Sequence, residues 1–238
     1  MSLSELLISL FLSTLLGSLL LQQYVSLSEN TNRQLTLFKH QFEQTLLSKL
    51  ITDSIHQAGF LPCGSQSTFD IWDASQSQWI KQQALITKPQ QLIATYMDKN
   101  FQPLASDYSS MPVVAKAIGL SPNHAILLTN CRYSELNLIQ SVKSMGSQYQ
   151  IVLAYPSRFV IDEDSYIGLW HQDNFEFQHD TLFYGDQKRE RITQALKEFN
   201  VISPSENIIN ITWQYKQLPS FDLSIWTANA KLNSRQQL

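Results

Sequence analysis

The sequence predicts an α+β protein: a long N-terminal helix, with a first half apolar enough to span a membrane, packed on an antiparallel β-rich globular head. Three observations predict this. No charged residue lies between Glu5 and Glu29, and no proline occurs before Pro62. Beyond about residue 65, short apolar and aromatic runs are separated by Pro, Gly, Ser and Asn, which is typical of strands joined by turns.

The apolar run from Leu6 to Val25 has the length of a membrane span, which needs about 20 residues. A cleavable signal peptide would carry basic residues ahead of this run, but no Lys or Arg precedes Arg33. A helix buried in a globular core is usually shorter. A simple membrane anchor stays open as an interpretation. It leaves Glu5 unexplained, because an ionisable side chain inside a membrane helix costs about 2.5 to 3.5 kcal/mol.

Helical spacing gives Glu5 a context. Glu5, Ser9, Ser13 and Gly17 recur every four residues and therefore follow one stripe of the helix. Small residues at this spacing let two helix backbones approach closely in lipid. We therefore expect Ser9, Ser13 and Gly17 to form a helix-packing face. The Glu5 carboxylate needs a positive partner there, and the nearest cation type is a free N-terminal amine, its own or that of a neighbouring copy.

The second half of the helix is predicted to be amphipathic. An apolar stripe suited to packing on a globular domain consists of Leu35, Phe38, Phe42, Leu46, Leu50 and Ile51. Gly59, with Pro62 beyond it, predicts the end of the helix. The chain thus divides into a transmembrane half-helix over 1–28, an amphipathic half-helix over 29–58 and a β-rich head over 59–238.

The first ten residues, MSLSELLISL, resemble the mature N-terminus of type IV prepilin-like proteins. In that family a short leader ending in Gly is removed before an apolar helix that carries Glu at position five, and the new first residue, usually Phe, is N-methylated. Met1 is a less common first residue, and the family's proline near position 22 is absent. The resemblance implies that Met1 is the processed end and that Glu5 pairs with a neighbouring subunit's N-terminal amine.

A second stretch, ITDSIHQAGFLPCG, resembles the end of the long helix in PilW-like minor pilins. There, Ala-Gly-aromatic is followed by a cysteine, which here gives Ala58, Gly59, Phe60 and Cys63. Those proteins carry another cysteine after an apolar strand, as HAILLTNC does here with Cys131. The resemblance covers about the first 65 residues. Beyond them it consists only of a similar pattern of apolar strands and a second cysteine.

Cys63 and Cys131 are the only cysteines of the chain. An exported chain enters an oxidising compartment in which paired thiols persist, so we expect a disulfide between them. Closing a loop of this size would stabilise the fold by about 4 kcal/mol in the chain-entropy treatment. Two unrelated buried thiols, which behave as small hydrophobic side chains, are the open alternative.

The head is expected to be mostly β-structure. Strands are predicted in QWIKQQALI, HAILLTNC, LNLIQSV, QYQIVLAY, SYIGLW, NIINITWQY and FDLSIWTA. One helix is predicted over 186–199, capped by Asp186, because Ile192, Ala195, Leu196 and Phe199 recur at helical spacing. The proline-rich segment 88–122 is expected to be a loop-rich excursion.

Motifs of catalysis are sparse, and we expect neither an enzyme nor a cofactor. The sequence has no G-x-S-x-G elbow, no H-E-x-x-H zinc spacing and no glycine-rich phosphate loop. The acids Asp162, Glu163 and Asp164 could bind calcium but lack the spacing of a calcium loop, so a solvated turn is favoured. Lys188, Arg189 and Arg191 are interpreted as a solvated helix face and not a DNA site, since the net charge is −3.

These features together predict a minor pilin that takes part in type IV pilus assembly, in the priming or tip complex. The resemblance implies other minor pilins and the major pilin as partners through their N-terminal helices, with a tip adhesin as a further partner and no nucleic acid. The expected location is the inner membrane with a periplasmic head, then the extracellular pilus. A type II secretion pseudopilin and a membrane-anchored envelope protein that never polymerises are the alternatives.

Overall fold

The computed structural model describes residues 3–105, 112–130, 132–162, 164–185, 189–193, 196–205, 208–216 and 219–226. At 3–6 and 204–205 it describes the backbone alone. The chain divides into two compact units, residues 1–49 and residues 50–238. A long N-terminal helix is followed by a large β-sheet, so the predicted α+β class is confirmed.

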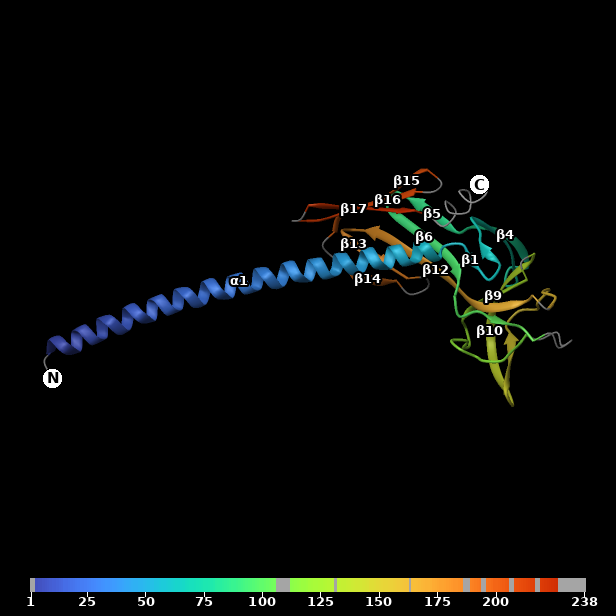
Figure 1. The fold of residues 1–238 in the computed structure, drawn as a ribbon, viewed down its shortest axis with the longest axis horizontal. Coiled ribbons are helices and arrows are strands. Elements are labelled where there is room, and N and C mark those ends of the chain that lie inside the picture. The colour runs from blue at the N-terminus through green and yellow to red at the C-terminus, as the bar shows by residue number, and fades with distance from the viewer. Residues whose placement is uncertain are drawn as a thin grey trace, which may run out of the picture. The chain divides into compact units, whose positions relative to one another are not determined.

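The helix α1 runs from Leu3 to Gln57 without interruption (Figure 1). Its bounds agree closely with the prediction. Among the described residues, its stretch from Leu7 onward is long and apolar enough to contain a membrane span. The helix ends before Gly59, which has a φ of 82°. A Cβ atom at Gly59 would lie 2.2 Å from the carbonyl oxygen of Gln66, so only glycine fits this turn.

The amphipathic stripe of α1 differs from the prediction. Leu35, Phe38, Phe42 and Leu46 are exposed by 68, 68, 62 and 42%. The side chains that are buried on the last turns lie on another line of the helix, at Leu47, Ile51, Ser54 and Ile55. The expectation that the whole predicted stripe is suited to burial in a globular domain is therefore wrong for its first four residues.

The head is built on one twelve-stranded sheet, ordered β14-β13-β12-β9-β10-β11-β8, with β3, β4, β5, β6 and β7 attached beside this path. Its two longest strands are β12, Tyr166–Gln178, and β10, Ser134–Met145. The others are β3 Thr68–Asp73, β4 Gln78–Gln83, β5 Leu85–Lys88, β6 Gln91–Met97, β7 Gln102–Pro103, β8 Val113–Val114, β9 Ala125–Thr129, β11 Gln148–Leu153, β13 Thr181–Tyr184 and β14 Glu190–Thr193.

Two smaller sheets complete the head. A hairpin of β1, Phe60–Leu61, and β2, Gly64–Ser65, follows the helix. Three antiparallel strands near the C-terminal end are β15, Leu196–Ser205, β16, Ile208–Tyr215, and β17, Ser220–Trp226. All strand pairs between described residues are antiparallel except β3 with β10, which are parallel.

The core lies on both faces of the large sheet. In β9, Leu127 belongs to one apolar cluster, with Phe69, Met97 and Trp170, whereas its neighbours Ile126 and Leu128 belong to a second. Successive strand residues point to opposite faces, so the two clusters cover opposite sides of the sheet. Figure 1 shows β6 alongside β12. The first residues of β12 pair with β9, which in turn pairs with β10.

The helix predicted over 186–199 is wrong. In its described part, the segment forms β14 and the beginning of β15, while Asp186 and Ala195 lie outside the described residues. A β-bulge between Leu196 and Glu198 explains the helical signal. The extra residue of a bulge brings side chains three apart onto one face, so Leu196 and Phe199 are both buried while the residues between them are exposed.

The segment 88–122 is more ordered than expected. It contains β6, which pairs with β12 along seven residues and has Leu92, Ala94 and Met97 fully buried. Pro89 precedes this strand and Pro103 ends the short β7. The prolines therefore mark the ends of strands in a segment that contributes to the centre of the sheet.

Candidate functional site

The predicted assembly face lies on the exposed first half of α1. Ser9, Ser13 and Gly17 all lie on this helix and are exposed. The side chain of Glu5 and the whole of Met1 lie outside the described residues, so the pairing of the carboxylate with an amine stays a prediction. A Cβ atom added at Gly17 would meet nothing within 4 Å. Nothing in the described part of the chain therefore requires a glycine at this position.

Three hydroxyl groups in this half-helix are satisfied by their own helix. Ser13, Thr14 and Ser18 donate hydrogen bonds of 2.8 to 2.9 Å to the carbonyl oxygens three residues before them. Such bonds let Ser and Thr lie in an apolar environment without an unsatisfied donor. Ser13, Thr14 and Ser18 are therefore compatible with a membrane span.

The predicted disulfide has one end in the described residues. Cys63 lies in the turn between β1 and β2, and Cys131 lies outside the described residues. Leu61, two residues before Cys63, and Leu127, four residues before Cys131, share one apolar cluster. The bond itself stays a prediction.

A buried polar cluster joins the end of α1 to the large sheet, and the sequence did not reveal it. At its centre is Asp173 on β12, which is 9% exposed. Its carboxylate accepts hydrogen bonds from Ser54 Oγ at 2.5 Å, Tyr96 OH at 3.0 Å and Tyr184 OH at 2.9 Å. These three hydroxyls come from α1, β6 and β13. Three donors supply the hydrogen bonds that a buried carboxylate needs.

Burial and the nearby charge of Asp173 change the acidity of the two tyrosines. Burial first, and then the Asp173 carboxylate, raises the pKa of Tyr96 and the pKa of Tyr184 well above their ordinary value of 10.0. Ionising either phenol would place a second negative charge beside Asp173. Both tyrosines therefore remain protonated donors at neutral pH.

Serine, histidine and aspartate lie near one another here, but they do not form a proton relay. Ser54 donates directly to Asp173, whereas His171 Nε2 lies 3.4 Å from Asp98 Oδ2. A nucleophilic serine needs the histidine as its hydrogen-bond acceptor. The observed contacts instead tie the end of α1 to β12.

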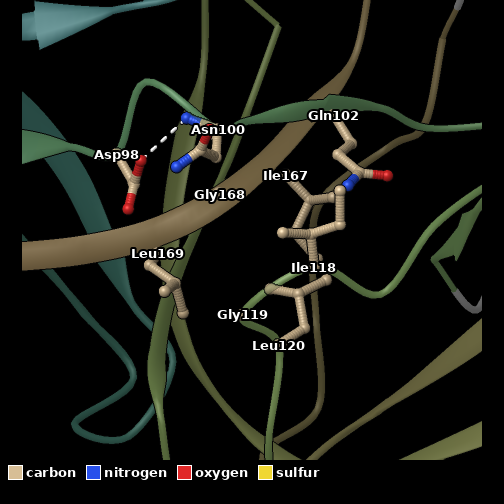
Figure 2. A pocket seen from close by; sticks show the side chains of 9 residues that line it. All are labelled: Asp98, Asn100, Gln102, Ile118, Gly119, Leu120, Ile167, Gly168 and Leu169. Carbon is tan, nitrogen blue, oxygen red and sulfur yellow. Dashed lines mark hydrogen bonds between the residues drawn. The ribbon is translucent and has the colours of Figure 1, made fainter.

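A pocket of about 40 Å³ lies between β12 and the loop at residues 118–120. Its polar side chains are Asp98, Asn100 and Gln102. The backbone N–H of Asn100 donates to Asp98 at 2.7 Å, and Gln102 Oε1 accepts from the backbone of Lys116 at 3.2 Å. Figure 2 shows Gln102 apart from the other two polar side chains. The pocket is far smaller than an ordinary small-molecule site of about 300 to 1,000 Å³.

The acidic and basic clusters noted in the sequence behave as surface groups where they are described. Asp162 accepts hydrogen bonds from Ser165 Oγ at 2.6 Å and Asn130 Nδ2 at 2.8 Å, and the bond from Ser165 is the main cause that lowers its pKa. Arg189 pairs with Glu176 at 2.9 Å. Glu163 and Lys188 lie outside the described residues.

Comparison with known proteins adds no relative from which a function could be transferred. No protein-family model, curated protein or solved structure matches this chain. The structure itself shows a pilin-like architecture, in which a long apolar N-terminal helix is followed by a β-rich head. This helix could anchor the protein in a membrane.

Proposed function

We propose that this chain is a minor pilin, similar to the PilW type, that takes part in type IV pilus assembly in the priming or tip complex. Before assembly, the apolar half-helix holds it in the inner membrane with the head in the periplasm. During assembly this helix packs against those of other minor pilins and the major pilin. A tip adhesin is a further partner. The observation that carries the proposal is the exposed apolar stripe of α1.

This stripe extends beyond the length of a bilayer. Leu35, Phe38, Phe42 and Leu46 lie at helical spacing and are exposed by 42 to 68%. If residues 6–25 fill the hydrocarbon core, Leu46 lies roughly 30 Å past it, at about 1.5 Å per residue. Exposed apolar patches of this kind mark interaction sites. A helix that only anchored a head would not need such a stripe outside lipid, whereas a helix that packs among other helices would.

The half-helix before the stripe also suits close packing. Gly17 has open space around it, and the hydroxyls of Ser13 and Ser18 are satisfied within the helix. In lipid, helix association depends on close backbone contact and van der Waals packing. This supports an arrangement in which the line of Ser9, Ser13 and Gly17 faces a neighbouring helix.

Glu5 then acts as the residue that selects and positions a neighbour. A carboxylate and an amine about 4 Å apart attract by about 4 kcal/mol at an effective dielectric constant of 20. An acid costs roughly 2.5 to 3.5 kcal/mol at the centre of a membrane helix, and Glu5 directly precedes the apolar run, so an attraction of this size can offset the cost of the acid there. The pairing therefore favours a chain that has left lipid contact for contact with another helix.

The experiment is to count pili on cells that carry Glu5→Ala, with Glu29→Ala as the matched control. Glu29 lies on the same helix just after the apolar run, so its loss removes an acid without removing the proposed pairing. We expect Glu5→Ala to abolish or strongly reduce piliation while the head keeps its resistance to protease. Glu29→Ala should leave the pilus number unchanged.

A normal pilus number in Glu5→Ala would contradict the proposal. Loss of protein secretion with normal pili would instead identify a type II secretion pseudopilin. No effect on either process would support a simple envelope anchor. The intact mass of the mature protein checks the N-terminus separately, since an N-methylated residue at Met1 is expected.

A further inference from the structure

The head carries a cluster of aromatic rings beside cationic side chains, which we name the aromatic-cation surface. It consists of Trp72, Trp79, Tyr133, Phe159, Arg132 and Arg158. Trp72 on β3 and Trp79 on β4 are cross-strand partners, with ring centroids 5.8 Å apart. Tyr133 lies 5.3 Å from Trp79, and Phe159 lies 5.7 Å from Tyr133. Four rings from three separate segments thus form one continuous group.

Buried residues under the aromatic-cation surface fix its position. Trp72 is 6% exposed, and the guanidinium of Arg158 lies 4.2 Å from its ring centroid. The fully buried Glu135 accepts a hydrogen bond of 2.9 Å from the backbone N–H of Arg158. Asn137 donates to the other oxygen of Glu135 at 3.2 Å. This buried network fixes the segment that places Arg158 over Trp72.

Trp79 is the open ring of the cluster, with 56% of its surface exposed. Two rings meet it at angles of 74° and 82°, which is the edge-to-face arrangement that aromatic pairs prefer. A tryptophan fixed by two neighbours loses little conformational freedom when a ligand stacks on it. The ring is therefore a preorganised platform.

The cations of this surface are available to a ligand. Arg132 and Arg158 are exposed, and neither forms an ion pair with a described residue. Asp162, which acts on Arg132 through its charge, is already hydrogen-bonded by Ser165 and Asn130. Lys81 lies opposite Asp70 on the neighbouring strand, so that pair adds no net charge. The guanidinium groups of Arg132 and Arg158 are the exposed donors beside the platform, whereas the carboxylate of Glu135 is fully buried.

An acidic sugar matches both halves of this surface. A pyranose ring has an apolar C–H face that can stack on an indole, and its rim of hydroxyls stays hydrated. A guanidinium binds a carboxylate through two parallel hydrogen bonds. We infer that the aromatic-cation surface binds an acidic polysaccharide, with a pyranose ring on Trp79 and a uronate carboxylate held by Arg132 and Arg158. This inference does not depend on the proposed role in pilus assembly.

The test measures binding of a mannuronate hexasaccharide to the full-length protein, with maltohexaose as the neutral probe. The protein is kept in a polyoxyethylene detergent, because sugar detergents would compete. We expect mannuronate to bind more tightly than maltohexaose and to lose affinity as salt is raised. Saturation-transfer NMR should show the ring protons of the sugar closest to the protein.

Two variants and a matched control locate the site. Trp79→Ala should weaken mannuronate binding about tenfold or more, and Arg132→Gln should weaken it several-fold and reduce its salt dependence. The control is Trp226→Ala, because Trp226 is 64% exposed on a strand of another sheet. It should bind like the unchanged protein. Near-ultraviolet circular dichroism checks that each variant is folded.

Four outcomes would overturn the inference. Equal binding by Trp79→Ala, or equal loss in Trp226→Ala, would show that the ring is not the platform. Equal binding of the neutral hexasaccharide would remove the role of the arginines. Trp and Arg are also frequent at protein interfaces; if no saccharide binds while Trp79→Ala impairs piliation, the surface contacts another subunit instead.

Discussion

At the scale of single residues, Asp173 is the group on which the end of α1 depends. Three hydroxyls from three elements converge on its carboxylate. Ser54 and Tyr96 are far from Asp173 in the sequence, and only Tyr184 is close to it. The four residues do not form a sequence motif. The sequence could not predict the cluster, because a buried carboxylate looks like any surface acid until the sheet pairing brings its donors together.

We predict that Asp173→Asn destabilises the protein by about 1.5 to 3 kcal/mol, the usual contribution of hydrogen bonds to a charged group. The asparagine amide has the same shape as the Asp173 carboxylate, but its oxygen accepts hydrogen bonds less strongly. Its NH2 group is a donor and would face the hydroxyl donors around it. Urea unfolding of the full-length protein, followed by tryptophan fluorescence, measures the change. Asp180→Asn is the control, because Asp180 pairs with Lys216 at a site where both are more than half exposed, and such pairs contribute little.

The two tyrosines predict how stability depends on alkaline pH. Their pKa values are raised in the folded protein above the ordinary 10.0, so the unfolded chain loses these protons first. Their contribution is fully present below about pH 10 and falls as the pH rises above it. The double variant Tyr96→Phe, Tyr184→Phe should flatten this fall. A slope of unfolding free energy against pH that is unchanged in the variant would contradict the assignment.

At the scale of elements, patterns that depend on near neighbours predicted well. The bounds of α1 followed from the lack of proline and from Gly59, and alternation located β9, β10, β11, β16 and β17. The failures came from long-range effects. The bulge at Leu196 imitated a helical period, and the strand β6 lies in a segment whose flanking prolines suggested a loop.

The exposed stripe of α1 gives a prediction at this scale. Phe38→Ser with Phe42→Ser should leave the stability of the isolated protein nearly unchanged, because both rings are more than 60% exposed. The same change should reduce piliation, since it removes apolar surface that neighbouring helices would cover. Pilus counts on cells that carry the double variant measure piliation, and the urea midpoint of the purified variant measures its stability.

Ile51→Ser provides the contrast for that experiment. Ile51 is fully buried on the same helix, so its loss should lower the unfolding free energy by about 2 to 5 kcal/mol. If Phe38→Ser with Phe42→Ser destabilises the isolated protein as much as Ile51→Ser does, the stripe contributes to the fold of the monomer and its role in assembly is contradicted.

At the scale of the whole molecule, the predicted α+β architecture of a long helix followed by a β-rich head is confirmed, whereas the side-chain clusters of the head could not be predicted from the sequence. The aromatic-cation surface illustrates the reason. Trp72 and Trp79 lie close in sequence across a turn, and a hairpin prediction could have paired them. Tyr133 directly precedes β10, and Arg158 lies between β11 and β12. Only the complete sheet brings these two residues next to Trp79 and Trp72.

The last prediction concerns the bond between Cys63 and Cys131, because this link would enclose every strand from β2 to β9. The double variant Cys63→Ser, Cys131→Ser should lose about 4 kcal/mol of unfolding free energy, since a long open loop gains entropy in the unfolded chain. Reduction of the unchanged protein with a thiol should produce the same loss, and the variant should not respond to the thiol. Mass spectrometry of a non-reduced digest identifies the linked peptides. Two free thiols in protein purified from the cell envelope would contradict the prediction and leave the apolar cluster around Leu61 and Leu127 to hold this region alone.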